Sequence, residues 1–134
     1  MAKSVLVVEP QLSLQSLWTA LLRRADLRPT AVPDGLSAIA ALKREQVDLV
    51  LMSSNLPDMD GFKLCSALKS LPGLKAPPVL LLLSDPSLVS AAKASASGAQ
   101  VVLKLPTNQK DADKFLMELA LVCLRVIDKT QGKS

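Results

Sequence analysis

The sequence contains no histidine and no tyrosine. Without histidine, a chain lacks the usual general base and the commonest zinc ligand, so a serine–histidine mechanism and a histidine-based zinc site are excluded. One tryptophan and two phenylalanines are the only aromatic residues. That is too few to build a stacking platform for single-stranded nucleic acid or a flavin ring.

Cysteine and long apolar runs are also scarce. The two cysteines, Cys65 and Cys123, fall within apolar patterns of helical spacing, where a thiol packs as a small hydrophobe. We therefore predict neither a disulfide nor a metal site. No apolar run approaches the length of a membrane span, and no leader with a basic start and a cleavage site is present. We expect a cytoplasmic protein without membrane contact.

Charge and length favour one globular domain. The net charge is +4 with 49% hydrophobic residues in 134, which suits a single core rather than disorder. We expect a domain over residues 1–128 and a polar tail or linker start over 129–134. The one local basic cluster, Arg23, Arg24 and Arg28, is interpreted as a solvated face, so no nucleic-acid binding by this domain is expected.

Short apolar runs alternate with segments of helical periodicity along the chain. The alternation predicts a parallel sheet of five strands with right-handed crossovers and helices on both faces. Pro29 and Pro33 place the second strand at an edge, which favours the flavodoxin-like order 2-1-3-4-5. The predicted strands lie near residues 5–8, 27–32, 47–52, 79–83 and 101–103, and helices follow each of them.

The chain is organised around the segment from Asp48 to Gly61, where a buried strand runs into a polar loop. Ligands of open α/β sheets bind beyond the carboxyl ends of the strands, so Ser53 stands where a catalytic side chain would be presented. It has no evident base. The two acids of the loop, Asp58 and Asp60, are interpreted as turn and helix-cap residues rather than a cation loop, and Asp34 is predicted to cap the second helix.

The segment Asn55-Leu56-Pro57-Asp58-Met59-Asp60-Gly61 resembles the phosphoacceptor loop of response-regulator receiver domains. The resemblance covers nearly the whole chain. It puts Ser53 where the family carries the aspartate that accepts the phosphoryl group. The chain therefore resembles a degenerate receiver, or pseudo-receiver, whose acceptor is missing.

The resemblance also implies roles for the surrounding positions. The adjacent acidic residues with which the family holds magnesium correspond to Glu9 and Pro10, and only the backbone carbonyl of Asn55 is left beside them. Glu9 is interpreted as a solvated residue at a strand end, with a lone functional acid as the alternative. With one carboxylate remaining, we expect no magnesium and no other cofactor.

The family's conformational switch is altered at the same time. Ser84 matches the hydroxyl after the fourth strand, with helix capping as the alternative role. The family's lysine falls at Leu105 and its switch aromatic at Val102. Lys104 lies one residue early, so it is expected to point to the other side of the strand into solvent.

The last helix is apolar around most of its circumference, whereas a surface helix needs only one apolar stripe. Leu121, Leu124 and Val126 are predicted to include a second face that contacts a protein partner or a second copy of the chain. Ordinary core packing with a few exposed apolar residues is the alternative.

Together these features predict an atypical bacterial receiver of two-component phosphorelay type. We expect that it is not an enzyme and that it acts by phosphorylation-independent protein contact. Two alternatives remain at this point. Ser53 could be phosphorylated as a nonstandard acceptor, or, more remotely, Ser53 and Lys104 could form a Ser-Lys hydrolase.

Overall fold

The computed structural model describes residues 2–71, 77–83, 96–105 and 109–131. Its elements in chain order are β1 Ser4–Val8, α1 Leu12–Arg24, β2 Arg28–Val32, α2 Gly35–Arg44, β3 Leu49–Ser53, α3 Gly61–Leu68, β4 Val79–Leu83, β5 Val101–Lys104 and α5 Gln109–Gln131. The helix expected between Ser84 and Gly98 lies mostly outside the described residues.

The strands form one parallel sheet in the order β2-β1-β3-β4-β5. This confirms the predicted flavodoxin-like topology, with β2 at an edge. Every residue of β3 and β4 is buried, as expected for central parallel strands covered on both faces. Pro29 and the exposed side chains of β2 suit its position at the edge.

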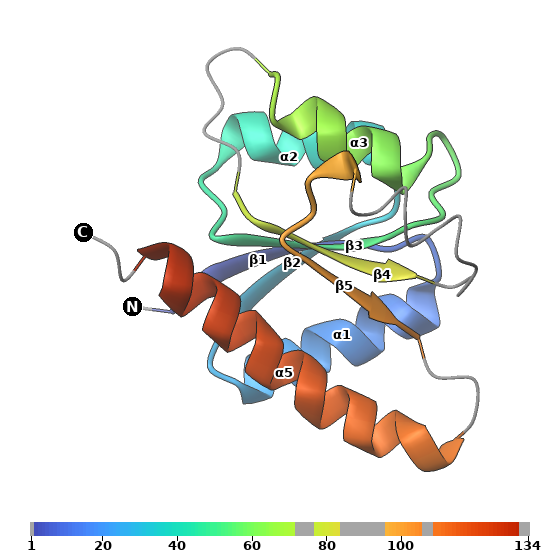
Figure 1. Cartoon of the computed structure of the whole chain (residues 1–134), viewed down its shortest axis with the longest axis vertical. Coiled ribbons are helices and arrows are strands. Elements are labelled where there is room, and N and C mark those ends of the chain that lie inside the picture. The colour runs from blue at the N-terminus through green and yellow to red at the C-terminus, as the bar shows by residue number, and fades with distance from the viewer. Residues whose placement is uncertain (1, 72–76, 84–95, 106–108, 132–134) are drawn as a thin grey trace.

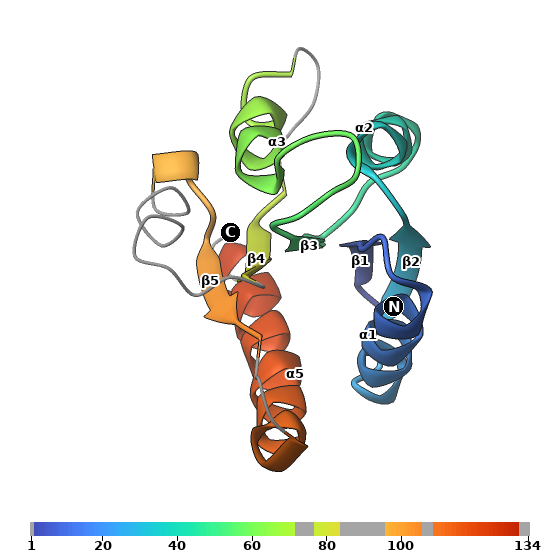
Figure 2. The same ribbon diagram turned by 90° about the vertical axis from the view of Figure 1, so that its right-hand side faces the viewer.

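Two hydrophobic cores lie on opposite faces of the sheet (Figures 1 and 2). Helices α1 and α5 cover one face, and α2 and α3 cover the other. Side chains alternate along each strand, so Val5 and Val7 enter the first core while Leu6 and Val8 enter the second. The same strands therefore contribute side chains to both cores.

The two cysteines are buried free thiols, one in each core, as predicted. Burial raises the pKa of Cys123 to about 12, so this thiol stays protonated. Among the described helices, none has the length and apolar character needed to cross a membrane.

Helix ends agree with the predicted caps. The Asp34 carboxylate accepts a hydrogen bond from the Ser37 N–H at 2.8 Å and caps α2. Helix α3 ends at Leu68, a few residues before Pro72. At the other end of the chain α5 continues to Gln131, so the first part of the predicted polar tail is helical.

Candidate functional site

The carboxyl ends of the strands meet at one edge of the sheet and bring Glu9 and Ser53 together. Val8 of β1 is paired with Met52 of β3, and each candidate residue follows directly after its member of that pair. The backbone N–H of Glu9 donates to the Val32 carbonyl of β2 at 3.0 Å. Glu9 and Ser53 therefore occupy neighbouring positions at the edge where α/β proteins bind ligands.

Ser53 ends β3 with its hydroxyl turned back onto its own loop. Its side chain is only 6% exposed. The Oγ accepts a hydrogen bond from the Asn55 N–H at 3.3 Å and donates to the Asn55 carbonyl at 3.4 Å. These contacts satisfy the hydroxyl locally, and among the described residues no carboxylate or lysine accepts its proton. A buried hydroxyl held in this way is poorly placed for a kinase or as a nucleophile.

Glu9 is buried, so the prediction of a solvated strand end was wrong. It is 3% exposed, because α1 folds back over the end of β1 and Gln15 Nε2 donates to the Glu9 carbonyl. The carboxylate accepts a hydrogen bond from the Gln11 N–H at 3.0 Å. Burial raises the pKa of Glu9, and the Gln11 N–H and the Trp18 side chain oppose that rise.

The Trp18 indole adds an unusual feature beside Glu9. It lies close enough to favour the charged carboxylate, but it does not reach full hydrogen-bond geometry. Within the described part of the chain, Trp18 Nε1 is a buried nitrogen without a hydrogen-bond partner. This pairing was not predicted, because the spacing of Glu9 and Trp18 in the sequence does not distinguish it from core packing.

The residues at this edge do not fit a magnesium ion. Magnesium requires oxygen ligands in an octahedron, usually from one or two carboxylates together with phosphate and water. Glu9 offers one carboxylate that already accepts the Gln11 N–H, Pro10 has no side-chain oxygen, and Ser53 is neutral. Over the described residues, no group of three His, Cys, Asp or Glu side chains could hold a metal.

The two acids of the loop cap two different helices, which confirms the interpretation as turn and cap residues. Asp60 accepts from the Phe62 N–H at 2.8 Å and caps α3. Asp58 accepts from the Gly35 and Leu36 N–H groups, both at 2.9 Å, at the start of α2. The Gly35 bond, followed by the Leu36 bond, lowers the pKa of Asp58. Both carboxylates are therefore committed to backbone donors.

The described residues of the fourth and fifth strands complete the edge, and none of them is a lysine next to Ser53. Leu105 donates its N–H to the Leu83 carbonyl at 2.9 Å and packs against the core under α1 and α5. Val102 packs against the opposite core. Lys104 is exposed, as predicted. Ser84 lies outside the described residues.

Strand β4 separates Lys104 from Ser53 in the sheet. The hydrogen bonds of Ser53 Oγ go to Asn55 instead. The described contacts of Ser53 therefore give no support to the alternative of a Ser-Lys hydrolase built on this pair.

Helix α5 has a distinct second face. Met117, Leu121 and Leu124 are 70%, 52% and 39% exposed, and their spacing of four and three residues places them along one stripe. Val126 is 6% exposed and lies in the core, so its assignment to the interaction face was wrong. Its helical position faces the sheet. Met117 was missed, although it lies one turn before Leu121.

Comparison with known proteins gives a consistent result. The response regulator receiver domain family matches residues 5–116. The chain is 33% identical over 109 residues, 80% of its length, to "Two-component response regulator-like APRR9" of Arabidopsis thaliana, of which the match covers 23%. It is 29% identical over 111 residues, 83% of its length, to the "DNA-binding response regulator MtrA" of Mycobacterium tuberculosis, of which the match covers 47%.

Solved structures show the same fold. A receiver domain of a histidine kinase from Syntrophus aciditrophicus superposes with a TM-score of 0.85 at 23% identity, over 99% of this chain and 96% of that one. The receiver domain of the Francisella response regulator 1452 gives 0.82 at 19% identity, over 96% and 99%. The curated relatives are longer, and the chain spans between about a fifth and a half of their length.

Proposed function

The chain belongs to the response regulator receiver domain family, and from this premise we propose that it is a degenerate receiver that signals by phosphorylation-independent protein contact. The observation that carries the proposal is Ser53, a buried hydroxyl bonded to its own loop at the end of β3. An acyl phosphate needs a carboxylate at the acceptor position, and a hydroxyl cannot form one. We further propose that the receiver spans residues 1–128 and that 129–134 begin a tail or linker.

The surroundings of Ser53 support the same proposal. Phosphoryl transfer depends on cations that neutralise the developing charge. Pro10 supplies no ligand, Leu105 is apolar, and Lys104 is turned away into solvent. Within the described part of the chain, a phosphoryl group at this edge would meet the buried Glu9 carboxyl without a lysine beside it. The edge therefore lacks the charge pattern for the family's reaction.

We propose that the contact is made by the exposed stripe of α5 with a second copy of the chain. All of its members are exposed: Lys114, Met117, Glu118, Leu121, Leu124, Arg125 and Asp128. Three apolar side chains at the spacing of a helix-packing seam form its centre, and charges of both signs border it. A stripe of this kind suits a protein partner better than solvent.

The charges favour a second copy, because the stripe is complementary to itself in an antiparallel arrangement. Lys114 precedes Leu121 by seven residues, and Asp128 follows it by seven. A two-fold axis at Leu121 would put Lys114 of one copy opposite Asp128 of the other, and Glu118 near Arg125. Isologous two-fold pairing requires this kind of self-complementarity. In a parallel arrangement like charges would face each other.

The test is sedimentation equilibrium of the full chain, with and without acetyl phosphate and magnesium. We expect a dimer in both conditions and no acyl-phosphate adduct by mass spectrometry. Leu121→Glu should weaken the dimer by about tenfold or more, since it buries a charge at the centre of the interface. The matched control is Leu12→Glu, which changes an exposed leucine of α1 and should leave the dimer intact.

A charge exchange makes the orientation testable as well. Lys114→Asp and Asp128→Lys should each weaken the dimer, and the double variant should restore it. A monomeric wild type, or a dimer unaffected by Leu121→Glu, would remove the proposed interface. A hydroxylamine-labile adduct would overturn the degenerate site, which is a separate result.

A further inference from the structure

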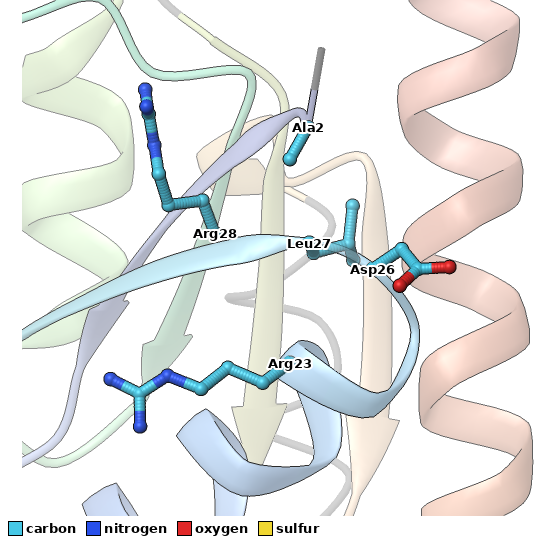
Figure 3. A pocket seen from close by; sticks show the side chains of 5 residues that line it. All are labelled: Ala2, Arg23, Asp26, Leu27 and Arg28. Carbon is cyan, nitrogen blue, oxygen red and sulfur yellow. The ribbon is translucent and has the colours of Figure 1, made fainter.

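A pocket of about 480 Å³ lies at the amino-terminal edge of the sheet, the edge opposite to Ser53 (Figure 3). Its lining residues are Ala2, Arg23, Asp26, Leu27 and Arg28. They come from the segment before β1, the end of α1, the turn after it and the start of β2. We propose that this pocket binds an acidic segment of a partner protein through Arg23 and Arg28. None of its residues belongs to the α5 stripe.

The turn between α1 and β2 fixes the backbone of both arginines. The Leu27 N–H donates to the Leu22 carbonyl at 2.9 Å, and the Asp26 N–H donates to the Arg23 carbonyl at 3.1 Å. This pair of bonds is a Schellman motif, with Asp26 in the left-handed region at φ 63°. Arg28 is held next, because its N–H donates to the Lys3 carbonyl at 2.8 Å. The pocket therefore stands on an ordered turn.

The two guanidinium groups are available to a ligand. Both arginines are exposed, and within the described residues neither forms an ion pair. In Figure 3 both side chains extend to the same side of the pocket, whereas the Asp26 carboxylate points to the other side. Guanidinium binds carboxylates with two parallel hydrogen bonds. An incoming acid would therefore meet unpaired arginines and displace no internal partner.

Stabilisation of helix ends explains only some of the basic residues at the amino-terminal edge of the sheet. Arg23 and Arg24 lie in the last turn of α1, and Lys43 and Arg44 in the last turn of α2, where cations stabilise the negative end of a helix. Arg28 starts a strand and Lys3 precedes one, so neither serves a helix end. The positive charges that stabilise no helix end therefore favour binding of an anionic partner.

The shape and surroundings of the pocket favour an acidic protein segment. Of the described residues that line the pocket, none lies at a helix N-terminus, which is the usual site for a compact phosphate, and Arg23 lies in the last turn of α1. The two arginine side chains extend separately, so they could bind successive carboxylates of an acidic peptide. Ala2 and Leu27 complete the lining, with Leu27 itself only 6% exposed. The lining has no aromatic ring on which a nucleic-acid base could stack.

The experiment is a fluorescence anisotropy titration of the full chain against a labelled oligoglutamate peptide at low ionic strength. Arg23→Gln with Arg28→Gln should weaken binding by about tenfold, because two charge-assisted contacts are lost. Lys63→Gln with Lys104→Gln is the control. It removes the same charge from exposed positions elsewhere and should change binding less than about twofold by long-range charge alone. Circular dichroism verifies folding of each variant.

Asp26→Asn should increase the affinity for the peptide, a result that unfolding of the variant would not produce. Asparagine also accepts the left-handed conformation, and the change removes the one negative charge of the pocket, so binding should tighten about two- to threefold. Absent peptide binding, equal losses in both double variants, or unchanged binding by Asp26→Asn would each overturn the proposal. Tighter binding of duplex DNA or phosphatidylserine vesicles through the same arginines would also overturn it.

Discussion

Glu9 combines a carboxyl group with almost complete burial at the end of β1. Burial disfavours the charged form and raises its pKa above the ordinary value of 4.5, in spite of the Gln11 N–H and the nearby Trp18 indole. The folded state therefore holds the proton more tightly than the unfolded state does. By linkage, the stabilisation from Glu9 is complete below the unfolded pKa and is lost as the pH rises through the folded pKa.

This sign gives a prediction for Glu9→Gln. Glutamine keeps the shape of the protonated acid, so the variant should gain stability relative to the wild type as the pH rises from 4 to 7. Denaturant unfolding at a series of pH values measures the difference. Glu45→Gln is the control, since Glu45 is an exposed carboxylate. A gain that is the same at every pH would contradict the assignment of the raised pKa to Glu9.

The burial of Glu9 also marks a limit of sequence reasoning about single residues. In the sequence Glu9 is a charged residue between an apolar run and Pro10, a pattern typical of a solvated strand end. Its burial depends on Gln15 and Trp18, which α1 brings back over the strand. For Val126, the apolar residue type did not show whether the side chain faces the core or the solvent. Its angular position on α5 places it in the core.

At the scale of elements, Gly61 joins β3 to α3 at a very close approach. A Cβ added there would lie 2.6 Å from the Ser53 carbonyl oxygen and 2.9 Å from the Ser54 Cα, both of which are backbone atoms. The Gly61 N–H also donates to the Ser54 carbonyl at 3.1 Å. The start of α3 is therefore packed directly onto the end of the candidate-site strand.

We expect Gly61→Ala to destabilise the fold by about 1–3 kcal/mol, because the backbone has to move to relieve the overlap. The change should also disturb the loop that holds Ser53. Gly35→Ala is the matched control. Its Cβ would meet the end of the flexible Met59 side chain, which can rotate away. Urea unfolding compares the two, and a smaller cost at Gly61 than at Gly35 would contradict the packing argument.

Elements were the most predictable level of this protein. Apolar runs such as Val79–Leu83 and caps such as Asp34 are local signals, and the structure has both where they were expected. Long-range partners were not predictable. Asp58 was interpreted as a cap, but its donors at Gly35 and Leu36 lie more than twenty residues earlier. Only the folded sheet brings the start of α2 against that loop.

The whole molecule is two cores on one sheet, which couples regions that are far apart in the chain. Leu119 on α5 lies in one core and Leu64 on α3 in the other, and both are fully buried. Strands β1, β3 and β4 contribute side chains to both. Losing either core would expose one face of the same central strands, so the two should unfold together as in most small domains.

Trp18 makes this coupling measurable, because the only tryptophan of the chain packs edge-on against Phe115 in the core under α1 and α5. Leu64→Ala, on the far side of the sheet, should cost about 2–5 kcal/mol as a large-to-small core substitution. The Trp18 fluorescence transition should then shift together with the circular dichroism transition, as it should for Leu119→Ala. The exposed Leu36→Ala should shift neither. If Leu64→Ala moved the dichroism transition but left the tryptophan transition in place, the two cores would be separate cooperative units.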